Sequence, residues 1–182
     1  EVLGKDKLKV LKGKRAIGHV RYSTTGSSIL RNAQPFHIRH DRFSVSIAHN
    51  GNLTNAADLR KKMEQEGAIF QTTMDSEVVL HLLVRAKKEC FEDSLVEALS
   101  KCEGAFTMLF LAEDRIVGVR DPYGFRPLCL GKKDSSYVLA SETCSLDLID
   151  AEYVRDVEPG EMVIITQEGL ESRKPFGEAP RS

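Results

Sequence analysis

The sequence lacks several features that would point to common classes of function. It has no glycine-rich phosphate loop, which argues against Rossmann and P-loop enzymes. No apolar run approaches the roughly 20 residues of a membrane span, and the polar residues 1–7 hold no signal-peptide core. The formal net charge is -1 with both signs interspersed, so neither nucleic acid nor a membrane is indicated as partner. We expect a cytoplasmic protein with a small-molecule partner.

Cysteine is scarce and scattered. The four thiols show no Cys-x-x-Cys spacing, so we predict neither a zinc site nor a disulfide framework, and buried free thiols are expected. The five histidines show no metal-ligand spacing with nearby acids, so no metal is expected. We interpret His19 and His49 as strand-end groups that are hydrogen-bonded in the core.

What the sequence does contain is a composition, 41% hydrophobic and 29% charged over 182 residues, that suits one globular domain with a core. Apolar periodicity predicts helices and strands in separate blocks, which favours an α+β fold over a parallel sheet. The predicted helices cover residues 54–67, 75–88, 92–101 and 142–149, and the predicted strands cover 16–20, 43–48, 105–112, 115–120, 125–131, 137–141 and 162–166. Residues 105–112 are apolar on both faces, which indicates stacked sheets covered by helices.

The stretch around Asn50 is the first candidate site. Residues 43–48 alternate as a strand and deliver Asn50 and Gly51 to what we predict is a corner at its end. Gly51 can adopt positive φ and lacks a Cβ, so its N–H could face a reacting carbonyl beside the Asn50 amide, as in an oxyanion hole. By itself Asn-Gly is more typical of an ordinary hairpin turn.

Two charged residues form further candidates. Arg21 closes a predicted strand, and its guanidinium can bind a carboxylate bidentately, with the neighbouring hydroxyls of Tyr22 and Thr24 as additional donors. A surface salt bridge in a polar loop is the alternative. Asp75 begins the second predicted helix, where an aspartate caps backbone N–H groups, and this role is compatible with ligand binding.

Four motifs taken together resemble the class II glutamine amidotransferases, which are N-terminal-nucleophile hydrolases. They are Gly-His-Val-Arg-Tyr-Ser-Thr at 18–24, His-Asn-Gly-Asn-Leu at 49–53, Asp-Ser-Glu at 75–77 and Arg-Asp-Pro-Tyr-Gly-Phe-Arg-Pro-Leu at 120–128. Within this class, Tyr-Ser-Thr-Thr-Gly at 22–26, Asn-Ala-Gln-Pro-Phe at 32–36 and the Phe-Arg-Pro-Leu ending are most similar to amidophosphoribosyltransferases. The resemblance covers nearly the whole chain.

The resemblance implies a four-layer αββα sandwich that lacks its first strand. Residues 1–167 would be a partial amidotransferase domain, and 168–182 a linker toward a missing phosphoribosyltransferase domain. The domain would hydrolyse glutamine and channel ammonia to phosphoribosyl pyrophosphate, in the first step of purine synthesis. The intact enzyme is expected to be a homo-oligomer that requires magnesium in the missing domain, and some members carry an iron–sulfur cluster; this fragment itself is expected to hold no cofactor.

The resemblance also assigns roles to the candidate residues. Arg21 and Thr24 would hold the α-carboxylate of glutamine, and Asp75 would pair with its α-ammonium group. Asn50 and the Gly51 N–H would stabilise the oxyanion. Tyr22, which lies in the same motif as Arg21, would couple glutamine binding to the partner domain.

The nucleophile is the point of departure from the family pattern. In this family it is an N-terminal cysteine whose own α-amino group is the base, whereas the sequence given starts at Glu1. Interior Cys90, Cys102, Cys129 and Cys144 cannot supply that amine, so structural roles are expected for them and the fragment is predicted to be inactive alone.

Two alternatives stay open at this point. The first is another class II enzyme, such as glucosamine-phosphate synthase or asparagine synthetase. Sugar-phosphate relatives usually carry Trp and a downstream His-Gly where this chain has Tyr22 and Thr25-Gly26, which argues against this alternative. The second is a non-catalytic glutamine-binding module that has lost its nucleophile.

Overall fold

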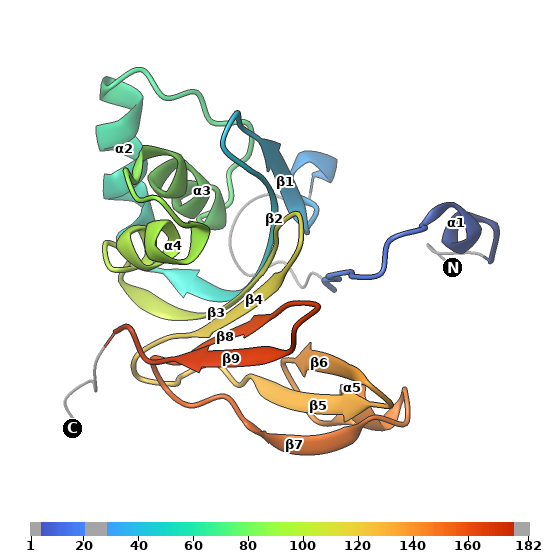
Figure 1. The fold of residues 1–182 in the computed structure, drawn as a ribbon. Coiled ribbons are helices and arrows are strands. Elements are labelled where there is room, and N and C mark those ends of the chain that lie inside the picture. The colour runs from blue at the N-terminus through green and yellow to red at the C-terminus, as the bar shows by residue number, and fades with distance from the viewer. Residues whose placement is uncertain (1–4, 21–28, 177–182) are drawn as a thin grey trace.

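The structure is a computed structural model that describes residues 5–20 and 29–176 (Figure 1). Its described helices are α1 (Lys5–Val10), α2 (Ala56–Gln65), α3 (Ser76–Arg85), α4 (Phe91–Leu99) and α5 (Cys144–Asp147), with a 3-10 turn, η1, at Leu30–Asn32. Its described strands are β1 (Phe36–Arg39), β2 (Ser44–Leu53), β3 (Gly104–Leu111), β4 (Ile116–Arg120), β5 (Cys129–Lys133), β6 (Ser136–Ala140), β7 (Glu152–Asp156), β8 (Met162–Ile165) and β9 (Leu170–Arg173).

The strands form two antiparallel sheets. Sheet A has the order β1-β2-β3-β4-β8-β9, and sheet B has the order β6-β5-β7. Figure 1 shows α2, α3 and α4 on one side of sheet A and sheet B on the other. The predicted α+β fold with stacked sheets is therefore confirmed, although in the described part of the chain the second helix layer consists of the four-residue α5 alone.

The main core lies between sheet A and its helices. Alternate residues of β3, including Phe106 and Phe110, point toward the helices and are at most 2% exposed. They meet Val78 and Leu83 of α3 and Leu95 of α4, all fully buried. The period of two in the strand and the helical spacing in α3 and α4 thus bring two apolar faces together.

Sheet B has a separate and much smaller core. Cys129 of β5, Leu146 of α5 and Ala151 form its buried cluster. A buried carboxylate links this sheet to sheet A: Glu161, next to β8, accepts hydrogen bonds from Arg155 of β7 and Ser172 of β9. Burial raises the pKa of Glu161, but these donors outweigh it and bring the pKa down to about 2.

Several expectations about local structure are wrong. Residues 16–20 form no strand, because an apolar run becomes a strand only where a neighbour completes its hydrogen-bond ladder. Helix α1 forms where the sequence predicts neither helix nor strand, and it lies apart from the body in Figure 1. Part of the predicted linker, Leu170–Arg173, is strand β9 and pairs with β8. The connection of the remaining tail to another domain stays a prediction.

The helix predictions are largely confirmed. The segments predicted from residues 54, 75 and 92 correspond to α2, α3 and α4. Thr54, the first residue of the predicted helix, lies outside α2. Asn55 is the N-cap, and the Thr54 hydroxyl donates to the Glu103 carbonyl oxygen. None of the described helices is long and apolar enough to cross a membrane.

Candidate functional site

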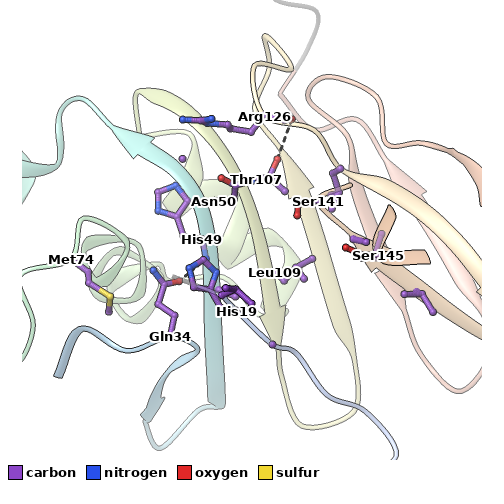
Figure 2. A pocket seen from close by; sticks show the side chains of 18 of the residues that line it. His19, Gln34, His49, Asn50, Met74, Thr107, Leu109, Arg126, Ser141 and Ser145 are labelled. Atoms are coloured by element: carbon purple, nitrogen blue, oxygen red, sulfur yellow. Dashed lines mark hydrogen bonds between the residues drawn. The ribbon is translucent and has the colours of Figure 1, made fainter. Parts of the chain in front are cut away.

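A cleft of about 960 Å³ opens between the two sheets (Figure 2). One wall comes from β2 and β3, with Asn50 and Thr107 among its residues, and the opposite wall includes Ser141 and Ser145. The cleft also extends to Asp75 at the start of α3. We call this space the inter-sheet cleft.

Among residues 5–20 and 29–176, no strand pairs with the edge of β2 where it borders the cleft. Strand β1 pairs with β2 only from Ser44 to Ile47. Beyond that point side chains replace the missing strand: the His49 N–H donates to Gln34 Oε1 at 2.7 Å, and the Leu53 N–H donates to Asp75 Oδ2 at 2.9 Å. Side chains thus accept hydrogen bonds from two backbone donors of this edge, those of His49 and Leu53.

Gly51 lies between these two donors, and its register fixes the direction of its N–H. Its partner in β3, Phe106, directs its own N–H and carbonyl to Asp121 on the far side. Gly51 and Phe106 are therefore a non-hydrogen-bonded pair of the antiparallel ladder. It follows that the Gly51 N–H faces the open edge, like those of His49 and Leu53.

The predicted corner at this position is wrong, whereas the need for glycine is real. Strand β2 continues through Asn50 and Gly51 to Leu53, because β3 pairs with it residue by residue. Gly51 has φ of 146°, and a Cβ there would lie 2.1 Å from the Ala105 carbonyl oxygen. Close backbone approach inside a strand pair, rather than a turn, requires glycine here.

Asn50 points to the opposite face of β2 from His49. Along this strand Ile47 and Leu53 pack in the helix-side core, so the alternate residues face sheet B. Asn50 is directly opposite Thr107 in the register, and Figure 2 shows the two side chains together in the cleft wall. The Asn50 amide and the Gly51 N–H thus belong to one short stretch of the cleft wall.

Asp75 joins the start of α3 to this edge. Its Oδ1 accepts from the Ser76 N–H at 2.8 Å, its Oδ2 accepts from the Leu53 N–H, and its Oδ1 lies 3.3 Å from His49 Nδ1. Burial raises the pKa of Asp75, but His49 and the two N–H donors outweigh it and lower the pKa below its ordinary value. The cleft therefore carries an ionised carboxylate that can attract a cationic group.

His49, which lies beside Asp75, has one ring nitrogen without a hydrogen bond to any described residue. Its Nε2 is buried and has no hydrogen-bond partner in the described part of the structure.

Glu77 holds the loop that precedes α3. It accepts from Gln71 N–H and from both the N–H and the hydroxyl of Thr72. Burial raises the pKa of Glu77, but the His81 imidazole and these donors bring the pKa down to about 2. The loop that leads to Asp75 is thereby tied to α3.

The Arg-Asp-Pro-Tyr motif builds the far end of the cleft. Asp121 is fully buried and accepts the Tyr123 N–H at 2.9 Å. The Arg120 guanidinium donates to the carbonyls of Gly124, Arg126 and Val157. These bonds fix the turn, and Figure 2 shows Arg126 at the cleft beside Thr107, whose hydroxyl donates to the Arg126 carbonyl.

The structure brings together all of the predicted site residues that it describes. Asn50 and Gly51 line the same cleft as Asp75, which lies 24 positions after Gly51 in the sequence. Arg21, Tyr22 and Thr24 lie outside the described residues, so their roles stay predictions. Sequence reasoning assigned no site role to Gln34, His49 or Arg126, which also line the cleft; their presence inside the family-like motifs was the available signal.

The cysteines are all free, as predicted. Burial, together with the Asp75 charge, raises the pKa of the Cys102 thiol to about 12, so it is unsuited to act as a nucleophile. The expectation that the thiols are buried holds only for Cys129, because Cys90 and Cys102 are half-buried and Cys144, at the start of α5, is exposed. Among the described residues no cysteine lines the cleft, and no three His, Cys, Asp or Glu side chains are grouped as metal ligands.

Comparison with known proteins decides the family. The model of the glutamine amidotransferase domain matches residues 19–147, which is more than half of the chain. The chain belongs to this family.

Relatives of this amidotransferase domain agree with its fold. The chain is 49% identical over 174 residues to amidophosphoribosyltransferase 1, chloroplastic, of Arabidopsis thaliana, covering 95% of this chain and 31% of that protein. A structure described as the allosteric regulatory enzyme of purine biosynthesis matches with a TM-score of 0.83 and 43% identity, covering 86% of this chain and 34% of that one. The glutamine phosphoribosylpyrophosphate amidotransferase of B. subtilis, solved with ADP and GMP, matches with a TM-score of 0.81 and 42% identity over 86% of this chain and 34% of its own.

These comparisons confirm the predicted fold and the predicted family resemblance. The amidotransferase domain described here spans about a third of the length of the curated relatives that it matches.

Proposed function

We propose that this chain is the glutamine-hydrolysing, ammonia-supplying domain of an amidophosphoribosyltransferase, the enzyme that aminates phosphoribosyl pyrophosphate at the start of purine synthesis. The observation that carries the proposal is the open edge of β2, where the Gly51 N–H and the Asn50 amide lie close to the ionised Asp75. The similarity to amidophosphoribosyltransferases over 95% of the chain supports the choice within the family.

Each end of glutamine has a partner in this proposal. Asp75 pairs with the α-ammonium group, while Arg21 and Thr24 hold the α-carboxylate. Asn50 and the Gly51 N–H donate to the side-chain carbonyl oxygen and stabilise the oxyanion that forms there. Recognition and chemistry thus use opposite ends of one ligand.

The reaction requires an N-terminal cysteine in a segment that precedes Glu1. Its thiol, deprotonated by its own α-amino group, attacks the side-chain carbonyl carbon and forms a tetrahedral intermediate. The C–N bond breaks as the amide nitrogen takes up a proton and leaves as ammonia, which gives a thioester. Water then cleaves the thioester to glutamate and restores the thiol.

The remaining parts of the proposal concern the intact enzyme. A phosphoribosyltransferase domain of the same full-length chain receives the ammonia, with magnesium as its metal, and Tyr22 couples the two sites. The enzyme acts as a homo-oligomer in the cytoplasm, and an iron–sulfur cluster accompanies some members of the family. The relative from Arabidopsis thaliana is named chloroplastic.

Calorimetry with L-glutamine tests the binding half of the proposal. The chain should bind glutamine, and Asn50→Ala and Asp75→Asn should each weaken binding about tenfold or more, since each removes a charge-assisted or desolvated hydrogen bond. Asp58→Asn, an exposed acid on α2, is the matched control and should leave the affinity unchanged. A folded chain that shows no glutamine binding would contradict the proposal.

Glutamate release tests the chemical half. The chain that starts at Glu1 should release no glutamate from glutamine. Addition of the preceding segment of an amidophosphoribosyltransferase, processed to a free N-terminal cysteine, should restore release, and replacement of that cysteine by alanine should abolish it. A well-folded extended protein without glutaminase activity argues for the non-catalytic glutamine-binding module instead.

A further inference from the structure

We infer that Asn32 and Gln34 form a two-ended clamp that sets the distance between the two halves of the glutamine site. The inference rests on the proposed function, because it assigns the clamp to a glutamine-binding cleft. Neither residue is placed in contact with glutamine; both act by positioning other groups. We call the pair the Asn32–Gln34 clamp.

Asn32 holds the loop that carries Asp75. Its side chain is buried, and the residue is 1% exposed. Its Nδ2 donates to Thr73 Oγ1 at 2.8 Å, and its Oδ1 accepts from the Thr73 N–H at 3.0 Å. Both halves of one carboxamide thus hold a residue that precedes Asp75 by two positions, which restricts the movement of the Asp75 loop.

Gln34 holds the strand that carries Asn50 and Gly51. Its Oε1 accepts from the His49 N–H at 2.7 Å, at the point where β1 no longer pairs with β2. Without this acceptor the His49 N–H would be a second unpaired donor near that of Gly51. The side-chain carbonyl oxygen of glutamine could then bind to the His49 N–H instead of the Gly51 N–H. Gln34 therefore keeps the edge in place and occupies the competing donor.

The two ends of the clamp are rigidly connected. A single residue, Ala33, separates them, and its backbone is extended with φ of -65° and ψ of 140°. The Ala33 N–H closes the η1 turn by donating to the Leu30 carbonyl oxygen at 2.9 Å. The clamp therefore spans the Asp75 loop and the edge of β2 with one residue between its two ends, and each end holds its own element through its own hydrogen bonds.

The two ends predict different ligand specificities, and a purely structural role does not. Gln34 supports the donors for the carboxamide of glutamine, whereas Asn32 supports the carboxylate for its α-ammonium group. L-Norvaline has the five carbons of glutamine without the carboxamide, and glutaramate has the carboxamide without the ammonium group. Each analogue thus tests one end of the clamp.

Calorimetry with the three ligands on the chain as it exists tests the inference. Gln34→Met should weaken glutamine and glutaramate about tenfold and leave norvaline unchanged. Asn32→Leu should weaken glutamine and norvaline about tenfold and leave glutaramate unchanged. Gln65→Met, on the exposed face of α2, is the matched control and should change none of the three affinities.

The outcomes separate failure of the clamp from failure of the proposed function. If the unmodified chain binds no glutamine, the proposed function fails. If it binds glutamine but a folded Gln34→Met variant weakens all three ligands equally, or none, the clamp is overturned and the proposed function stands. Circular dichroism melts verify folding, and the Gln34→Met pattern decides the inference even where Asn32→Leu does not fold.

Discussion

The two sheets of this domain are stabilised in different ways. Sheet A packs three helices over a continuous core in which Phe106, Leu83 and Leu95 are almost completely buried. Sheet B packs only α5 and leaves Leu148 86% and Tyr153 48% exposed. The half with the large core carries every described residue that we assign to glutamine, while the smaller half contributes the opposite cleft wall.

The difference shows where rigidity is needed. Oxyanion donors work only if they are held in place before the substrate arrives, and the ladder between β2 and β3, backed by the helix layer, provides that. Sheet B is attached to sheet A through the Glu161 network and through a small buried cluster of Leu128, Val157 and Val163. We therefore expect sheet A to set the chemistry and sheet B to be the less stable half.

The largest effect is expected for Phe106→Ala in sheet A. Phe106 pairs with Gly51 and is 2% exposed, so its removal should lower the free energy of unfolding by about 3–5 kcal/mol. Urea denaturation followed by circular dichroism measures this. A loss below about 1 kcal/mol would show that the helix-side core is not the principal source of stability.

Leu146→Ala is the corresponding change in sheet B. Leu146 is 1% exposed, and we expect a loss of about 2–4 kcal/mol because a cavity forms beside β5. Hydrogen exchange should lose protection in β5 to β7 before β2 and β3. Leu148→Ala, two residues further along, is the control and should stay within about 0.5 kcal/mol of the unmodified chain. Equal loss of protection in both sheets would remove the proposed difference between them.

Gly51→Ala tests the close approach of β2 to β3. The new Cβ would lie 2.1 Å from the Ala105 carbonyl oxygen, so we expect a loss of about 1–3 kcal/mol in the free energy of unfolding. Gly169→Ala is a matched control, because Gly169 has a similar φ of 134° but open space at its Cβ. A thermal melt of each variant separates the effect of close approach from that of backbone strain. Equal losses of stability in the two variants would show that close approach to the Ala105 carbonyl oxygen is not the cause.

The smallest effects are expected in the dependence of the free energy of unfolding on acidic pH. The pKa values of Glu77 in the sheet A half and Glu161 at the junction are both about 2, below the ordinary 4.5. Because folding depresses both values, their contribution to stability is complete above pH 4.5 and is lost as the pH falls toward 2. Glu77→Gln and Glu161→Gln should each flatten this acid dependence.

Urea denaturation at several pH values measures that slope. Glu64→Gln, an exposed substitution on α2, is the control and should keep the slope of the unmodified chain. The comparison between sheets also has a direct readout here: Glu161→Gln should expose β5 to β7 to hydrogen exchange, and Glu77→Gln should not. An unchanged slope in both variants would show that the two carboxylates do not govern acid stability.

Much of the fold could be predicted from the sequence. Helical spacing located α3 and α4, and the doubly apolar residues 105–112 indicated a strand between two layers. Asp75 was predicted at a helix start and does cap α3. The sequence could not locate β9 or reject a strand at residues 16–20, because strand formation depends on a partner that lies far away in the chain.

The residues of the candidate site could be predicted from the sequence, but their backbone conformation and contacts could not. Asn50 and Gly51 were chosen as donors, but the turn expected there is a continuous strand. Gln34 and Asn32 lie in a family-like motif, but the motif does not reveal their role, because their hydrogen bonds reach residues 15 and 41 positions away, respectively. Contacts at such separation follow from the arrangement of whole elements.

The sequence by itself determined which chemical groups are available and which segments form the helices. Its four motifs also determined the family. Only the tertiary structure decided that the pairing of β1 with β2 stops at Ile47, before His49. It also decided that side chains accept hydrogen bonds from the His49 and Leu53 N–H groups on that edge. The physical reason is that periodicity and residue chemistry are local properties, whereas the direction of an N–H in a sheet is set by which neighbouring strand is present and where it stops.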